Sequence, residues 1–353
     1  MCAHRNLADV VEHSRLGAVL QKVSRDPELT GVVARLEVPD GGIVWEGSTG
    51  DLDTETPFFV ASTTKLYTTA IVLRLADSGK LDLTDPVMSH LEGLQGLHVM
   101  EGVDRTGDIT IRHLLSQTSG LPDYFEGKQA GGGSLEESVR TGEDRSWGMD
   151  YVLESSKKMG AKFAPGAGKK ALYSDTNYQL LGRIIEVVDG TPYSQAVEDH
   201  VSQPLGLGQT WVYTDPSDGR PAALRDGDHA LHIPEAMVSF GPDGGVVATV
   251  GDLMVFLRAF FEGGLFDQSR LASMMEFRRI FYPLQYGVGI SRFRLPKVMS
   301  PFSRPPDLIG HSGLSGAFAF RDNESGTYLA GTVNNLAKPS RSFQMMLRLL
   351  RAV

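Results

Sequence analysis

The stretch from Phe58 to Gly79 contains a serine and a lysine whose types and spacing could support nucleophilic chemistry. Ser62 and Lys65 are three residues apart, so they lie on one face if this segment is helical. Apolar surroundings lower the pKa of a lysine, and its neutral amine can then take the proton of a nearby hydroxyl. The helix N-terminus favours the developing negative charge. These features predict a nucleophile at Ser62, although a serine at this position is more often a simple N-cap.

Two further local motifs carry side chains that could move protons. The first is Y-S-D at 173–175, where a tyrosine near a lysine can act as a general base if its phenolate is stabilised. The alternative is a tyrosine that covers a helix end, with Asp175 as the N-cap. The second is H-S-G at 311–313, where glycine near a strand start allows a ligand backbone to approach closely. The alternative there is a turn with an incidental histidine.

Together the three motifs resemble the ordered signature of the serine β-lactamase and penicillin-binding-protein superfamily: S-x-x-K, then Y-x-(N/D), then H-x-G. The chain is most similar to the class C β-lactamase-like branch, which includes family VIII carboxylesterases, D-aminopeptidases, D-Ala-D-Ala carboxypeptidases and acyltransferases. The resemblance extends from about Gly31 to Asn335. Further matching blocks are L-L-S-Q-T-S-G-L-P-D-Y (114–124), Y-S-D-T-N-Y-Q-L-L-G (173–182), P-L-G-L (204–207), G-G-V-V-A-T-V-G-D-L (244–253) and Y-G-V-G (286–289).

The resemblance implies a role for each matching position. Ser62 would be the acylated nucleophile, and Lys65 would accept or relay its proton and hold Tyr173 in a low-pKa state. Tyr173 would act as general base or acid toward the leaving group and toward the water that hydrolyses the acyl-enzyme. His311 would replace the lysine of the lactamase K-T-G motif, with its protonatable ring in the same hydrogen-bond network. The backbone N–H groups of Ser62 and Leu314 would form the oxyanion hole. The substrate-binding positions would be Tyr124, Asp175, Ser312 and Gly313.

One departure from the family pattern bears on the substrate. The family has Asn where this chain has Asp175, and an ionised carboxylate cannot donate a hydrogen bond to a substrate carbonyl. Asp175 could instead pair with Lys65, accept from a cationic or N–H-bearing substrate, or be only the helix cap. Efficient β-lactam hydrolysis is therefore not expected.

The apolar patterning predicts an α+β fold, in which N- and C-terminal helices pack on an antiparallel β-sheet and a mostly helical domain is inserted. The resemblance implies that this fold is β-lactamase/transpeptidase-like. Residues 1–80 and 240–353 are expected to form the sheet domain and residues 81–239 the helical one, with the active site between them. Predicted helices cover 6–23, 110–120, 151–159, 178–188 and 340–350, and predicted strands cover 32–38, 43–47, 286–290, 317–321 and 328–333.

Composition excludes several classes of function. The 353 residues carry a net charge of −9, which argues against a nucleic-acid partner, and no apolar run is long enough to span a bilayer. Cys2 is the only cysteine, so no internal disulfide or cysteine-based metal site can form. The N-terminus carries charges where a signal peptide needs an apolar core, so a cytoplasmic location is expected.

The leading hypothesis is a serine hydrolase that cleaves small carboxylic esters through an acyl-enzyme, without a metal or cofactor. The alternatives in the same chemistry are a D-aminopeptidase or other amide hydrolase, a weak β-lactamase and an acyltransferase. A non-catalytic, penicillin-binding-type sensor is the alternative from another class. The expected partner is a small ester or amide, not a nucleic acid or a membrane, and the oligomeric state is left open. The Gly-rich loop at 126–146 is expected to border the pocket.

Overall fold

A computed structural model describes residues 7–39, 42–129, 131–296 and 305–353 of the chain. Residues 1–6, which include Cys2 and the charged N-terminus used to predict location, lie outside the described residues. In the described ranges, no helix combines the length and the apolar character that crossing a membrane requires.

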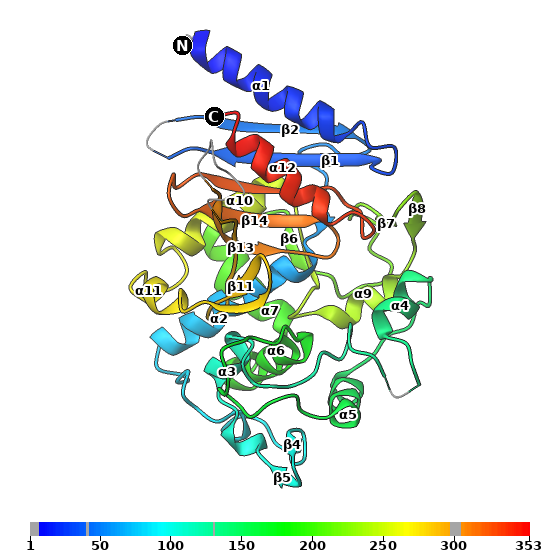
Figure 1. The fold of residues 1–353 in the computed structure, drawn as a ribbon, viewed down its shortest axis with the longest axis vertical. Coiled ribbons are helices and arrows are strands. Elements are labelled where there is room, and N and C mark those ends of the chain that lie inside the picture. The colour runs from blue at the N-terminus through cyan, green and yellow to red at the C-terminus, as the bar shows by residue number, and fades with distance from the viewer. Residues whose placement is uncertain (1–6, 40–41, 130, 297–304) are drawn as a thin grey trace.

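Helices and strands alternate irregularly along the chain (Figure 1). The helices are α1 (Leu7–Val23), α2 (Thr64–Asp77), α3 (Ile111–Leu115), α4 (Leu135–Arg140), α5 (Met149–Met159), α6 (Asp175–Asp189), α7 (Tyr193–Val197), α8 (Gln203–Leu205), α9 (Pro234–Phe240), α10 (Val250–Glu262), α11 (Arg270–Met274) and α12 (Ser340–Leu350). The strands are β1 (Gly31–Glu37), β2 (Val44–Gly50), β3 (Phe58–Phe59), β4 (Val99–Met100), β5 (Val103–Asp104), β6 (Thr210–Val212), β7 (Leu224–Asp226), β8 (His229–Leu231), β9 (Val246–Ala248), β10 (Arg278–Phe281), β11 (Leu284–Tyr286), β12 (Ser291–Arg294), β13 (Asp307–Ser312), β14 (Ala317–Asp322) and β15 (Tyr328–Thr332).

The two ends of the chain share one antiparallel sheet, as the sequence predicts. Its strand order is β10-β11-β12-β13-β14-β15-β1-β2. The junction between the ends is the pairing of β1 with β15, in which Val33 lies opposite Thr332. The α+β class is therefore confirmed.

Helices cover both faces of this sheet. Strand β14 is an example of a strand with apolar residues on both faces, because its side chains alternate between the two faces of the sheet. Phe318 and Phe320 pack with α1 and α12 on one face, whereas Ala317 and Ala319 belong to the core that contains α2 and α10. The small alanines let the segment that carries Ser62 approach the sheet closely.

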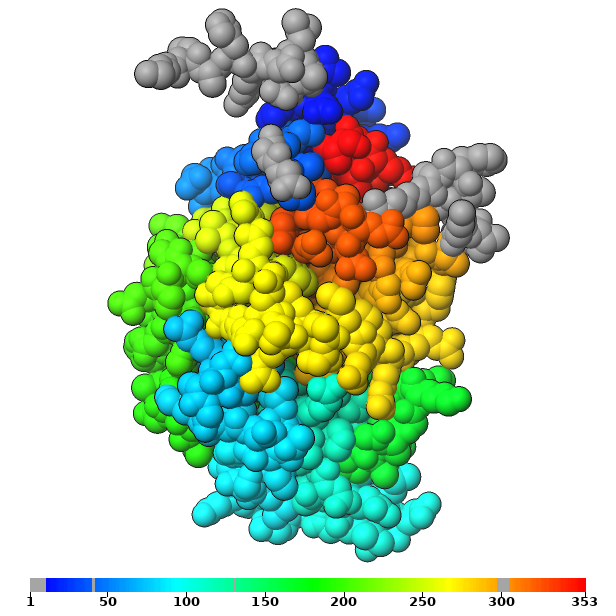
Figure 2. Space-filling model, turned by 90° about the vertical axis from the view of Figure 1, so that its left-hand side faces the viewer, coloured from blue at the N-terminus to red at the C-terminus, as the bar shows by residue number. Residues whose placement is uncertain are grey.

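Helix α2 lies between the sheet and the mostly helical middle of the chain, where it contacts β13, α6 and α7. Figure 2 shows the blue and red ends of the chain together at one pole of the molecule and the cyan segment at the other, with part of the green segment along one side. A small sheet with the order β3-β9-β6 joins the segment before α2 to the segment before α10. The domain boundaries at residues 80 and 240 stay a prediction.

Most predicted elements are confirmed within the described residues, but two differ. The helix predicted at 110–120 ends after α3, because Gln117 adopts a left-handed backbone with φ +57°. The strand predicted at 286–290 is wrong: β11 ends at Tyr286 and a turn follows, closed by a hydrogen bond from Gly287 N to Ile290 O. The two glycines of Y-G-V-G favour this turn over a strand, and Gly289 has φ +74°.

Candidate active site

Ser62 lies in a strained turn at the start of α2. The chain leaves β3, makes a short 3₁₀ turn over Ala61–Thr63 and enters α2 at Thr64. Ala61 has φ +45°, a conformation that residues other than glycine rarely adopt. Strain of this kind persists only where the surroundings enforce it, and it often accompanies function.

Gly313 is part of those surroundings. A Cβ atom at this position would lie 2.6 Å from Val60 O and 2.7 Å from Ala61 Cβ. The end of β13 therefore packs directly on the turn that carries Ser62, and only glycine fits between them. The sequence analysis predicted that this glycine lets a ligand backbone approach closely. In the structure, the backbone that approaches closely is that of residues 60–62 of the same chain.

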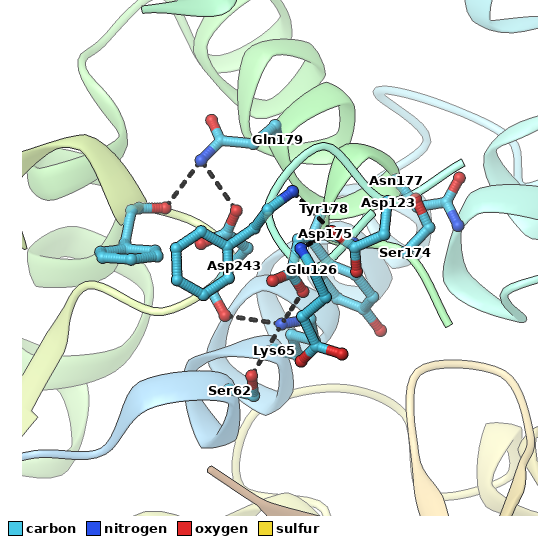
Figure 3. A network of polar contacts seen from close by, with 12 residues as sticks. Ser62, Lys65, Asp123, Glu126, Ser174, Asp175, Asn177, Tyr178, Gln179 and Asp243 are labelled. Atoms are coloured by element: carbon cyan, nitrogen blue, oxygen red, sulfur yellow. Dashed lines mark hydrogen bonds and ion pairs between the residues drawn. The ribbon is translucent and has the colours of Figure 1, made fainter. Parts of the chain in front are cut away.

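Lys65 is fully buried and joins Ser62 to the inserted region. Its Nζ donates to Ser62 Oγ at 3.2 Å and to the carbonyl oxygen of Asp243 at 2.7 Å. It also forms an ion pair with Asp175 Oδ1 at 2.7 Å. Figure 3 shows these groups converging on the Lys65 ammonium, with Glu126 beside them. The predicted contact between Ser62 and Lys65 is present, and so is the pairing of Lys65 with Asp175.

The charge state of Lys65 differs from the prediction. Burial by itself lowers the pKa of Lys65, but the nearby carboxyl groups of Asp175 and Asp243 more than offset this effect and raise the pKa above its ordinary value. Lys65 is therefore an ammonium ion in this structure. The prediction of a neutral amine considered burial alone and is wrong for this state.

Tyr173 lies beside the same lysine, with its ring centre 5.1 Å from Lys65 Nζ. Burial and the negative charge of Asp175 raise the pKa of Tyr173 well above its usual value, and a hydrogen bond with Ser62 opposes them only in part. The prediction that Lys65 holds Tyr173 in a low-pKa state is therefore wrong here. Tyr173 keeps its proton, so it is equipped to donate one.

His311 is 3% exposed and belongs to a chain of tyrosines. Its Nδ1 lies 2.9 Å from the carbonyl oxygen of Ser312, which can only accept, so Nδ1 carries the proton. Nε2 then accepts from the Tyr286 hydroxyl at 3.1 Å, and that hydroxyl lies 3.0 Å from Tyr178 Oη. Burial and the charge of Lys65 lower the pKa of His311 to about 3. The ring stays neutral, so the predicted protonatable role is wrong at ordinary pH.

Two aspartates flank Lys65. Asp175 is the first residue of α6, and Ser174 is the N-cap, so the alternative of Asp175 as a helix cap is wrong. Asp243 lies between α9 and β9, where its Oδ2 accepts from Tyr124 Oη and from Gln179 Nε2, both at 2.9 Å. Burial and the charge of Asp175 raise the pKa of Asp243 well above its usual value, against the opposing effects of Lys65 and of these two hydrogen bonds.

A small pocket opens beside Ser62. Its wall is mainly apolar and comes from both halves of the chain. The polar members of its lining include Ser62, Ser315 and three carboxyl groups, those of Glu126, Asp175 and Asp243. The apolar members are Phe59, Ala61, Phe125, Val139, Leu224, Ile233, Met237, Phe240, Leu314 and Leu336.

Some of the remaining predicted site residues line this pocket and others do not. Leu314, whose N–H is a predicted oxyanion donor, lines it beside Ser62. Tyr124, Ser312 and Gly313 are not among the described lining residues, and Tyr124 is fully buried behind the wall, where it supports Asp243. The predicted loop 126–146 contributes Glu126 and Val139 to the pocket, and its residue 130 lies outside the described residues.

Glu126 is a residue that the motifs did not identify. Its side chain is still exposed to solvent, and it stands at the pocket rim. Partial removal from water and the charge of Asp175 raise the pKa of Glu126 to about 7, against the opposing pull of Lys65. It follows the block L-P-D-Y by two residues, but nothing in that spacing indicates that its carboxyl belongs to the pocket.

Comparisons with known proteins agree with this architecture. The family model described as Beta-lactamase matches residues 21–352. A curated relative, the putative penicillin-binding protein PbpX of Bacillus subtilis, is 28% identical over 242 residues. That match covers 66% of this chain and 53% of the relative, so the chain spans about half the length of PbpX.

Solved structures match over nearly the whole chain. The D-amino acid amidase from Ochrobactrum anthropi SV3 is 26% identical, with a TM-score of 0.78 and coverage of 96% of this chain and 100% of the amidase. EstCE1, a hydrolase with promiscuous acyltransferase activity, is 19% identical, with a TM-score of 0.79 and coverage of 98% and 100%. The likeness to EstCE1 concerns the fold alone.

Proposed function

Because the chain belongs to the β-lactamase family, we propose that it is a serine hydrolase that forms an acyl-enzyme on Ser62. The observation that carries the proposal is the contact of 3.2 Å between Ser62 Oγ and the buried Lys65, at a pocket that both halves of the chain line. A hydroxyl in a strained turn, bonded to a buried lysine and open to an apolar pocket, has the arrangement of an activated nucleophile.

Each neighbour of Ser62 then has a chemical task. The positive charge of Lys65 stabilises the alkoxide that forms when Ser62 loses its proton. The protonated hydroxyl of Tyr173 can donate to the leaving group, because its raised pKa keeps the proton in place. The N–H groups of Ser62 and Leu314 would hold the oxyanion of the tetrahedral intermediate.

The pocket favours a particular acyl group. Its aromatic and aliphatic wall suits an apolar side chain, while Glu126 and Asp175 bring negative charge close to the nucleophile. An acyl group that carries both an apolar side chain and an ammonium group meets both features. We therefore propose amino-acid amides or short peptides as substrates, in keeping with the similarity to a D-amino acid amidase. Esters of the same acyl groups would form the same acyl-enzyme.

The other hypotheses have less support. The hypothesis of simple alkyl esters does not use the carboxyl groups of the pocket, and no contact among the described residues favours an alcohol over water as acyl acceptor. The sensor hypothesis does not account for a protonated Tyr173 beside Ser62.

A turnover assay with matched substrates tests the proposal. We would compare D- and L-phenylalanine p-nitroanilide with their N-acetyl forms, and add p-nitrophenyl butyrate and nitrocefin. We expect turnover of a free-amine anilide that exceeds turnover of its acetylated form and disappears in Ser62→Ala. Turnover that survives in Ser62→Ala would refute a Ser62 nucleophile. Stoichiometric consumption of nitrocefin without turnover would indicate a sensor instead.

A further inference from the structure

The protonation state of Lys65 poses a chemical problem for the reaction. An ammonium ion has no lone pair, so Lys65 can take the proton of Ser62 only if it passes one of its own protons on. The raised pKa of Lys65 makes this the resting situation at neutral pH. A second acceptor must therefore lie within reach of Lys65 Nζ.

The contacts of Lys65 identify that acceptor. Among the atoms that Nζ contacts in the described part of the chain, Ser62 Oγ is the proton source and the carbonyl oxygen of Asp243 cannot hold a proton as a base. The remaining contact is Asp175 Oδ1 at 2.7 Å, an ionisable oxygen. We propose that Asp175 is the terminal acceptor of the Ser62 proton and that Lys65 relays it.

The relay balances in atoms and charge. The O–H bond of Ser62 breaks as a new N–H bond forms on Lys65, and another N–H bond of Lys65 breaks as an O–H bond forms on Asp175. Lys65 keeps its charge of +1 throughout. The negative charge moves from Asp175 to Ser62 Oγ, which then attacks the substrate carbonyl. The alkoxide forms beside a cation that is already in place.

Three further carboxyl groups surround Asp175. Asp123 approaches from the turn after α3, with its Oδ2 accepting from Asp175 N at 3.2 Å, and Glu126 lies on the same turn. Asp243 faces Asp175 from the loop before β9. Asp175 is therefore one of four carboxyl groups that lie close together beside Lys65. The remaining titratable groups of the network are Tyr124, Tyr173 and Tyr178, with His311 facing Lys65 from β13.

The contact between residue 175 and Lys65 also explains why an aspartate at this position differs from an asparagine. An Asn, which the family motif has at this position, can hydrogen-bond to Lys65 but cannot accept its proton at ordinary pH. Asp175 does not touch the reacting oxygen, so it acts through Lys65. This inference rests on the proposed acylation of Ser62.

The test is the pH profile of acylation in Asp175→Asn, a substitution that keeps the shape of the side chain. With an amino-acyl p-nitrophenyl ester, we would measure the burst of p-nitrophenol from pH 5 to 10 by stopped flow. Without the acceptor, only the neutral amine of Lys65 can take the proton. Acylation at pH 7 should then fall by on the order of 10²-fold and should rise about tenfold per pH unit toward alkaline pH. Asp123→Asn is the matched control, since it removes a neighbouring carboxyl group without touching Lys65, and the shape of its profile should match the wild type.

Three outcomes separate the inference from the proposed function. A profile in Asp175→Asn with the wild-type shape, at any height, would overturn the relay while Ser62 acylation stands. Failure of the wild type to acylate Ser62 would overturn the proposed function itself. Should Asp175→Asn not fold, a proton inventory of wild-type acylation in H₂O–D₂O mixtures decides: a curved plot indicates two protons in motion, and a linear plot contradicts the relay.

Discussion

At the scale of single residues, the protonation states around Ser62 result from two opposing effects, removal from water and the charge of neighbouring groups. For Lys65 the neighbouring carboxyl groups prevail and the pKa rises. For His311 burial and the Lys65 charge act together, and its pKa falls to about 3. At neutral pH the site therefore contains a charged Lys65, a neutral His311 and a protonated Tyr173 side by side.

The rim carboxyl group of Glu126 gives a testable pH dependence. Because its pKa is about 7, it is ionised above that pH and gains a proton as the pH falls through it. KM for a substrate with a free ammonium group should therefore rise between pH 7.5 and 5.5. In Glu126→Gln the KM should be about fivefold higher at pH 7.5, equivalent to roughly 1 kcal/mol, and independent of pH in this range.

Two controls define this prediction. The N-acetylated substrate should show no change in KM on the Glu126→Gln substitution. Glu143→Gln, which alters an exposed carboxyl group paired with Arg145, should behave as the wild type. An equal change in KM for charged and neutral substrates would show that Glu126 shapes the pocket and does not recognise charge.

The sequence predicted the identity of the central residues better than their states. Helical spacing predicted that Ser62 and Lys65 lie together, and the family resemblance added Tyr173. Both arguments depend only on the positions of residues in the sequence. It missed Glu126 and Asp243, which arrive from loops that no local pattern relates to Ser62. The pKa directions of Lys65 and Tyr173 could not be predicted, since they depend on carboxyl groups that come together only in the folded chain.

At the scale of elements, the short turn before α2 and the end of β13 form a tight joint. The backbone of Gly313 contacts the turn so closely that a methyl group has no space. The joint would hold the Ser62 N–H near the Leu314 segment, as the proposed oxyanion hole requires.

Gly313→Ala tests this joint. Its Cβ would force the backbone at Val60 and Ala61 to move, so we expect a loss of kcat/KM on the order of 10²-fold and of unfolding free energy of about 1–3 kcal/mol. Gly251→Ala in α10 is the matched control, because its Cβ would meet no atom closer than 3.9 Å and alanine favours a helix. Wild-type kcat/KM in Gly313→Ala would show that the joint does not position Ser62.

Element prediction succeeded where periodicity is strong and failed where glycine changes the backbone. The apolar stripe of α12 predicted its bounds of 340–350, and the alternation in β14 predicted that strand. At 286–290 the apolar residues suggested a strand, but the glycines there form a turn that packs against Met274 and Leu115. Such a turn depends on partners distant in sequence.

At the scale of the whole molecule, the sheet separates two cores with different tasks. One core, around α2 and α10, supports the candidate active site, and the other contains α1, α12 and the opposite sheet face. The second core joins the two ends of the chain, so it should determine stability more than catalysis.

Met346→Ala tests this separation. Met346 is fully buried in the second core, and its truncation should lower the free energy of unfolding by about 2–5 kcal/mol. The kcat of the folded fraction should be unchanged. Gln344→Ala, on the exposed side of the same helix, should change stability by less than about 0.5 kcal/mol. A loss of kcat in Met346→Ala well below its unfolding temperature would contradict the separation.

The central claim is that Ser62 becomes acylated. The most direct measurement is the intact mass of the protein after acid quench from an amino-acyl p-nitrophenyl ester, followed by peptide mapping of the modified residue. The account predicts one added acyl group, located on Ser62 in the wild type and absent from Ser62→Ala. An acyl group on another residue, or an unmodified protein that nevertheless turns the ester over, would contradict it.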